Sequence, residues 1–246
     1  MGSSMRLLRG KKVRCFLVLL CIQLLLFATG CSHTLEIKNL ASYQATCANS
    51  FGKRLSVGVV PKAPDLETTK LVKAVGAELS KYGAEVLLPY EYNSKPVDII
   101  ASIAVTPHYE GSGWNFLINF PGFLIFTPAW HGYIYDVTFD VNVDLLKASD
   151  KTPIGNFKIP FKLDVRHAAM NRTWTEISWF EVGVIALVSG IVFTSYDDGV
   201  TQPTVDRSSV TIGDYIAQEI INRVNGSGKF SGVRLGPAPL IDLAAR

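Results

Sequence analysis

Residues 133–165 carry the most regular alternation of apolar and polar positions in the chain. Odd positions from Tyr133 to Leu145 are apolar, whereas the even positions between Asp136 and Asp144 are Asp, Thr or Asn. The alternation resumes from Phe157 to Val165, after a loop that contains Pro153 and Gly155. A period of two is typical of strands with one buried face. The pattern therefore predicts a long β-hairpin over residues 133–165.

Charged residues on the outer face of this hairpin suggest a register. If the position numbers of paired residues sum to 302, apolar residues face one another and opposite charges lie across the ladder. The predicted charge pairs are Asp144 with Lys158, Asp140 with Lys162, and Asp136 with Arg166. Such cross-strand pairs contribute about 0.2–1 kcal/mol each, so burial decides the fold and the charges help to fix the register.

The remaining periodic segments predict helices and shorter strands. Strands are expected at 55–60, 84–88 and 97–105. The first two flank a helix that Asp65 caps at its N-terminus and Gly83 at its C-terminus. A polar loop at 201–209 is expected to precede an amphipathic helix at 214–224. Together these elements predict an α+β fold of the α/β sandwich type, with a mainly antiparallel sheet.

An aromatic segment at 114–130 interrupts this pattern. As a strand, it would place Trp114, Phe116, Ile118 and Phe120 on one face, with Pro121-Gly122 at the centre of a type II turn. Apolar residues would also occupy the opposite face, so something must cover the segment. The cover could be another part of the chain, a partner subunit or a membrane.

A second apolar segment lies at 179–196. Its uncharged core is shorter than the roughly 20 residues of a membrane-spanning helix. A packed helix, a hairpin turning at Ser189-Gly190 and a spanning helix all remain open. The candidate interface residues from the two segments are Trp114, Phe116, Phe120, Phe123, Phe126, Trp130, Trp179 and Phe180.

The first 30 residues have the organisation of a secretory signal. Five basic residues and no acidic one lie between Arg6 and Arg14, and an apolar run extends to Phe27. The run ends in Ala28-Thr29-Gly30-Cys31, which resembles the cleavage site of bacterial lipoproteins. The resemblance implies cleavage after Gly30, with diacylglycerol on the Cys31 thiol and a further acyl chain on its new amino group. Because Ser32 is not Asp, it also implies transfer to the outer membrane.

These features divide the chain into a signal peptide at 1–30, a lipid-anchored linker at 31–54 and one periplasmic domain at 55–246. The order strand, helix, strand, followed by Val97-Asp98-Ile99-Ile100-Ala101, resembles the core of periplasmic assembly lipoproteins. That group includes the curli-secretion pore subunit, the activators of penicillin-binding proteins and the amino-terminal domain of the Tol propeller protein. This resemblance covers roughly residues 55–165.

Removal of the signal changes the charge of the chain. The 216 residues that remain hold 19 Lys and Arg against 21 Asp and Glu, a net charge of −2. This balance argues against nucleic acid as a partner, because nucleic-acid binding needs clustered basic residues. Cys47 is the only cysteine left besides Cys31, so no internal disulfide is expected.

The sequence contains no G-x-S-x-G elbow, phosphate loop, H-E-x-x-H motif or zinc-type cysteine pair. We therefore expect no catalysis, no metal and no cofactor other than the lipid on Cys31. The leading hypothesis is an accessory subunit of an envelope assembly, which binds envelope proteins or itself. One alternative is an enzyme or ligand carrier with a site at Trp130, His131 and Tyr133; another is an outer-membrane pore component.

Overall fold

The computed structural model describes residues 34–44, 50–51, 54–91, 95–119, 121–169 and 194–227. These residues divide into two compact units. Unit 1 holds 34–36, 111–135, 166–169 and 194–196 of the described residues, and unit 2 holds the others. The signal peptide, Cys31, Cys47 and most of the segment 179–196 lie outside the described residues.

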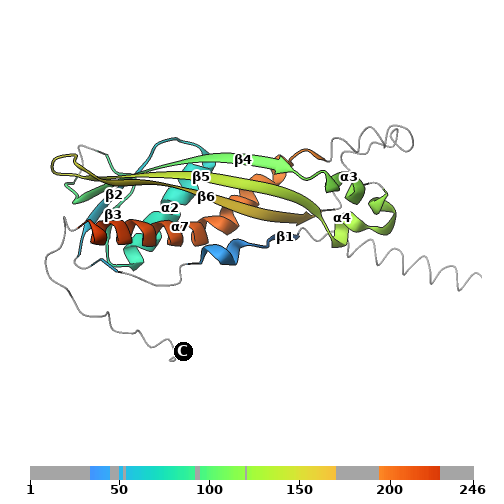
Figure 1. The fold of residues 1–246 in the computed structure, drawn as a ribbon, viewed down its shortest axis with the longest axis horizontal. Coiled ribbons are helices and arrows are strands. Elements are labelled where there is room, and N and C mark those ends of the chain that lie inside the picture. The colour runs from blue at the N-terminus through green and yellow to red at the C-terminus, as the bar shows by residue number, and fades with distance from the viewer. Residues whose placement is uncertain are drawn as a thin grey trace, which may run out of the picture. The chain divides into compact units, whose positions relative to one another are not determined.

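The described strands form a six-stranded sheet in the order β1-β6-β5-β4-β2-β3 (Figure 1). Their bounds are β1 Thr34–Ile37, β2 Ser56–Pro61, β3 Glu85–Leu87, β4 Ile99–Gly111, β5 Tyr133–Lys147 and β6 Pro153–Ala168. The sheet is mixed, because β2 runs parallel to both of its neighbours, β3 and β4. The expected α+β class is confirmed.

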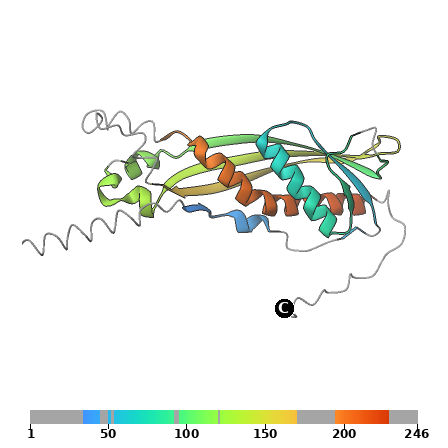
Figure 2. The same ribbon diagram turned by 180° about the vertical axis from the view of Figure 1, so that it is seen from behind.

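The described residues also form helices. The longer ones are α2 at Leu66–Lys81 and α7 at Thr201–Gly226; the shorter ones are η1 at Leu40–Tyr43, α3 at Trp114–Asn119, η2 at Gly122–Ile125, α4 at Thr127–Trp130 and η4 at Asp198–Val200. Within unit 2, α2 and α7 lie side by side across one face of the sheet (Figure 2). Figure 1 shows the opposite face of the sheet, on which no described helix of unit 2 lies.

The parallel pairing of β2 with β4 depends on a polar contact at the start of both strands. The Asp98 carboxylate accepts hydrogen bonds from the Ser56 backbone N–H at 2.8 Å and from its hydroxyl at 2.7 Å. The Asp98 backbone N–H donates to the Ser56 carbonyl in return. These bonds hold the register in which Val57 lies opposite Ile99.

The predicted N-cap of α2, Asp65, is confirmed, whereas the C-cap residue is Tyr82 and the predicted Gly83 stands one position beyond it. The Asp65 carboxylate accepts from the Thr68 backbone N–H at 2.7 Å, and Gly83 follows the helix with φ of +91°. The face of α2 that includes Leu71, Val75 and Leu79 is fully or almost fully buried. A Cβ added at Gly213 of α7 would lie 2.7 Å from the Cβ of Ala74, so the two helices approach closely at this point.

The predicted loop at 201–209 is wrong, because these residues form the first turns of α7. Thr204, Ser208 and Ile212 recur at helical spacing and are buried. The Ser208 hydroxyl donates to the Thr204 carbonyl at 2.8 Å, so its polar group is satisfied inside the helix. The polar composition of this stretch therefore conceals a buried helical face.

The predicted hairpin is present as β5 and β6, and Val137 to Leu145 alternate between buried and less buried positions as expected. The predicted charge pairs of Lys158 with Asp144 and of Asp140 with Lys162 are wrong. The Lys158 ammonium pairs with Asp140 at 2.9 Å. Asp144 pairs with Lys62 instead of Lys158.

The segment expected to be a linker contains a folded arm at residues 34–44. Strand β1 takes the edge of the sheet beside β6, and η1 follows it. Asn39 donates to the Lys162 carbonyl at 2.7 Å and accepts from the Asp164 N–H at 3.0 Å. The Tyr43 hydroxyl bonds both the carbonyl and the N–H of Lys162, at 3.0 and 2.9 Å. Two side chains thereby bond the backbone of β6 as a neighbouring strand would.

Candidate contact surface

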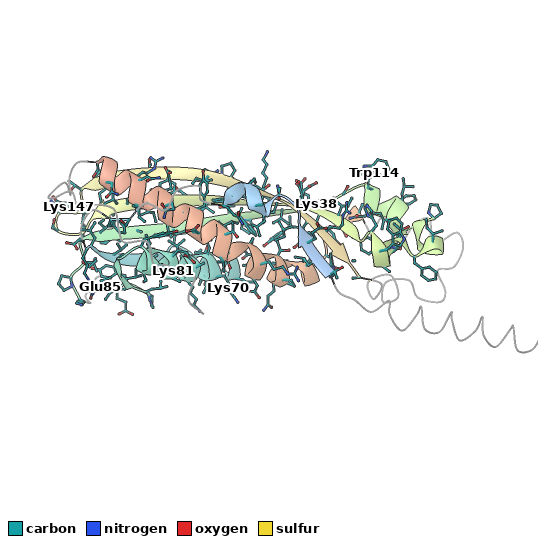
Figure 3. All side chains as sticks on the ribbon, turned by 90° about the horizontal axis from the view of Figure 1, so that it is seen from below. Lys38, Lys70, Lys81, Glu85, Trp114 and Lys147 are labelled. Atoms are coloured by element: carbon teal, nitrogen blue, oxygen red, sulfur yellow. The ribbon has the colours of Figure 1, made fainter. Side chains whose placement is uncertain are left out.

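Unit 1 exposes a group of large apolar side chains that we call the aromatic surface. Its members, with their exposed fractions, are Trp114 (66%), Leu117 (47%), Ile125 (66%), Phe126 (45%) and Trp130 (66%). The other exposed large apolar residues among those described are Leu66 and Val210, both in unit 2. Figure 3 labels Trp114 on α3, beside the side chains of the neighbouring short helices.

The segment that carries this surface is not the predicted strand. It forms α3, η2 and α4, and Gly122 does not have the positive φ that the predicted type II turn requires. Apolar residues stand at successive positions here, so the segment lacks the alternation that a one-sided strand would need.

Asn115 fixes α3 to the start of β5. Its side-chain amide donates to the Ile134 carbonyl at 2.8 Å and accepts from the Ile134 N–H at 2.7 Å. The Ser112 N–H also donates to the Ile134 carbonyl, at 3.1 Å. Asn115 itself is fully buried. These bonds anchor α3 to β5, whereas the side chains of Trp114 and Leu117 remain exposed.

The second half of the surface is held by backbone geometry around α4. Phe126, which precedes the helix, has φ of +58°, a left-handed conformation that costs a residue with a side chain about 1–2 kcal/mol. Its carbonyl accepts from the Ala129 N–H at 2.9 Å. The Trp130 indole N–H donates to the Ile125 carbonyl at 3.0 Å. The exposed indole therefore has its polar atom already bonded within the unit.

A shallow hollow of about 350 Å³ opens beside this surface. It is lined by Trp114, Leu117, Ile118, Thr127, His131 and Ile134. The His131 Nδ1 lies 3.0 Å from the Gly132 carbonyl, which can only accept, so Nδ1 donates to that carbonyl. Four of these six lining residues are apolar, so the hollow suits an apolar group.

The predicted cluster of Trp130, His131 and Tyr133 is only partly brought together. The rings of Trp130 and His131 meet edge to face, with centroids 5.8 Å apart. Tyr133 is fully buried and does not line the hollow. The described residues hold no group of three or more His, Cys, Asp or Glu side chains placed to bind a metal.

The other predicted interface residues have different outcomes. Phe116 is half-buried on α3. Phe120, the Phe123 side chain, Trp179 and Phe180 lie outside what the structure describes, as does Cys31. The sequence interpretation omitted Leu117 and Ile125 from the interface, although both are exposed. The sequence did offer a signal for both residues, because they belong to the same uncharged apolar segment, 114–130.

Within the described residues, no helix is both long enough and apolar enough to span a membrane. The segment 179–196, for which a spanning helix was one of three possibilities, is described only at residues 194–196.

Comparison with known proteins gives no family. No family model matches the chain, and no curated protein matches it. Among solved structures, a protein of Caulobacter crescentus provisionally named a lipoprotein has 10% identity and a TM-score of 0.38. The match covers 69% of this chain and 90% of the Caulobacter chain. XCC0632 of Xanthomonas campestris, of family DUF330, has 10% identity and a TM-score of 0.36, covering 75% and 96%.

A third solved structure is the PelC dodecamer of Paraburkholderia phytofirmans. It has 10% identity and a TM-score of 0.25, and the match covers 74% of this chain and 98% of the PelC chain. All three TM-scores lie below 0.5, so these likenesses assign neither a family nor an activity to this chain.

Proposed function

We propose that this protein is a lipid-anchored accessory subunit of a cell-envelope assembly, such as a secretion, surface-polymer or motility apparatus. It works by contact with other envelope proteins or with copies of itself, and it performs no catalysis. Cys31 carries the anchor, and the outer membrane is the membrane that holds it.

The observation that carries this proposal is the shortness of the tether. The folded arm begins at Thr34, three residues after Cys31. Three residues of extended chain span about 10 Å at most. A domain attached so closely cannot search the space away from its membrane. Its partners are therefore components of the same membrane or proteins bound to it.

Amine-reactive crosslinking in intact cells tests this function. The lysines of the described residues all belong to unit 2, and they include Lys38, Lys70, Lys81 and Lys147, which are labelled in Figure 3. We expect crosslinked species with envelope proteins or with a second copy of the chain. The matched control is Cys31→Ser, which removes the lipid and should remove these species.

Two results would contradict the proposal. One is a mature protein that retains Met1 to Gly30 or lacks acyl chains on Cys31 in its intact mass. The other is a lipidated protein that remains monomeric by light scattering and forms no crosslinked species with any protein in cells.

The hollow beside His131 supports a second candidate, a carrier or enzyme for a small apolar ligand. Its volume of about 350 Å³ falls within the range of small-molecule sites. A ligand that raises the melting temperature of the parent but not of His131→Ala would favour this candidate. The candidate would be contradicted if the His131→Ala strain kept its phenotype and the ligand changed the melting temperature of the variant as it does that of the parent.

A further inference from the structure

The aromatic surface belongs to the longest uncharged run of the described chain. No Asp, Glu, Lys or Arg occurs between Gly111 and Tyr135. An exposed apolar patch without charges marks a surface that is covered in the working protein. Tryptophan is frequent at the interface between lipid and water, where its ring lies at the level of the headgroups.

The hydrogen bonding of the surface suits burial in lipid. A polar group moved into a medium without water costs free energy unless it is already bonded. The Trp130 N–H has such a bond, to the Ile125 carbonyl. The Asn115 amide uses both of its atoms on Ile134. These two side chains thus need no water in order to be satisfied.

The lipid attachment point leads into the same unit. Thr34–Glu36 of β1 belongs to unit 1, together with the aromatic surface. β1 lies next to β6 in the sheet, and the end of β6 touches the turn that follows α4, because a Cβ added at Gly132 would lie 2.6 Å from the Ala168 nitrogen. The chain from Cys31 therefore enters the structure beside the helices that expose the aromatic side chains.

We propose that the aromatic surface lies in the lipid–water interface of the membrane to which Cys31 is anchored. This inference rests on the proposed function, because it requires the anchor. The short tether holds this bilayer within about 10 Å of Thr34 at all times, whereas a protein partner must first be recruited. The bilayer is therefore the occupant that the position of the surface favours.

The absence of basic residues specifies the kind of lipid contact. Surfaces that bind anionic lipids do so through clusters of Lys and Arg, and salt weakens them. Between Gly111 and Tyr135 there is no such residue. The contact is therefore apolar, and neither anionic lipid nor salt should alter it.

An environment-sensitive fluorophore tests the inference on the lipidated full chain. Cys47→Ser leaves no free thiol in the mature protein, and Ile125→Cys then places the NBD dye on the aromatic surface. Val210→Cys is the matched control, because Val210 is also a large exposed apolar residue, 58% exposed, but belongs to unit 2. Leu117→Cys provides a second site on the aromatic surface.

In phosphatidylcholine vesicles, we expect NBD emission at 125 and 117 to shift to the blue and to be quenched by brominated lipid. Emission at 210 should stay as it is in water. Added anionic lipid or 1 M salt, which reduces the Debye length to about 3 Å, should leave the shift at 125 unchanged.

Water-like emission at both 125 and 117 in vesicles would overturn the inference. If the dye is shielded in native envelopes but not in pure lipid, a protein covers the surface; the inference then fails and the proposed function stands. A shift that depends on anionic lipid also contradicts it. The intact mass of the same sample tests the acylation of Cys31 separately. An unacylated Cys31 would overturn the proposed function itself.

Discussion

Replacing Gly213 with Ala should destabilise the contact between α2 and α7. The new Cβ would lie 2.7 Å from the Ala74 Cβ, 3.0 Å from the Ala74 carbonyl carbon and 3.1 Å from the Val75 nitrogen. Two of these three neighbours are backbone atoms of α2. A change of side-chain rotamer cannot relieve the contact, so the helices themselves must move apart.

The magnitude follows from two opposing effects. Overpacking a buried contact costs about 1–3 kcal/mol, and rigid backbone neighbours place this site in the upper part of that range. Alanine is a better helix former than glycine by about 1 kcal/mol. The free energy of unfolding should therefore fall by about 1–2 kcal/mol. In a domain of this size each kcal/mol lowers the melting temperature by about 2–4 °C.

Urea unfolding followed by far-UV circular dichroism measures this change. Gly226→Ala is the control, because a Cβ there would have no packing neighbour within 4 Å, so this variant should not lose stability. Combining Gly213→Ala with Ala74→Gly removes the shortest contact. The double variant should recover part of the loss, with a coupling of about 1 kcal/mol. A Gly213→Ala protein as stable as the parent would refute the close helix contact.

Three further substitutions test other contacts. Asn115→Ala should leave the Ile134 N–H without its partner, whereas the Ile134 carbonyl keeps its bond from the Ser112 N–H; the unpaired N–H costs about 1–3 kcal/mol locally. Hydrogen exchange should rise in 114–130, and equal exchange there would contradict the assigned bonds. Asp65→Ala removes the cap of α2 and should cost about 1 kcal/mol in urea unfolding, whereas Asp136→Ala, at an exposed position, should not. Burial, with a hydrogen bond to Asp214, raises the pKa of Tyr82 from 10.0 to about 12. The stabilisation that this shift contributes is complete below pH 10 and is lost as the pH rises through about 12; Tyr82→Phe should abolish this loss, and identical pH profiles would contradict it.

Local sequence patterns were enough to predict the elements that bury one face and expose the other. The alternation from Tyr133 to Leu145 located β5, and Asp65 with Gly83 bounded α2, because these signals lie within the elements themselves. The start of α7 was missed for the opposite reason. Thr204 and Ser208 are weak helix formers, and they are helical because their face is buried in the folded unit.

The register and the aromatic segment depended on contacts that are distant in sequence. Asp144 pairs with Lys62 of another segment, so charge pairing within the hairpin alone could not fix the register. The helix α3 is held by bonds between Asn115 and Ile134, nineteen positions away. The sequence did show that 114–130 needs a cover, but it could not show that its apolar residues stand on short helices.

The arm at 34–44 has a consequence for the solubility of the protein. An uncovered strand edge offers unpaired backbone groups to other chains and invites aggregation. β1 covers part of the β6 edge, and Asn39 and Tyr43 occupy the backbone groups of Lys162 and Asp164 farther along it. A chain cut after residue 44 would expose this edge, and such fragments should join through their β6 strands. The arm at 34–44 thus also keeps the sheets of neighbouring molecules apart.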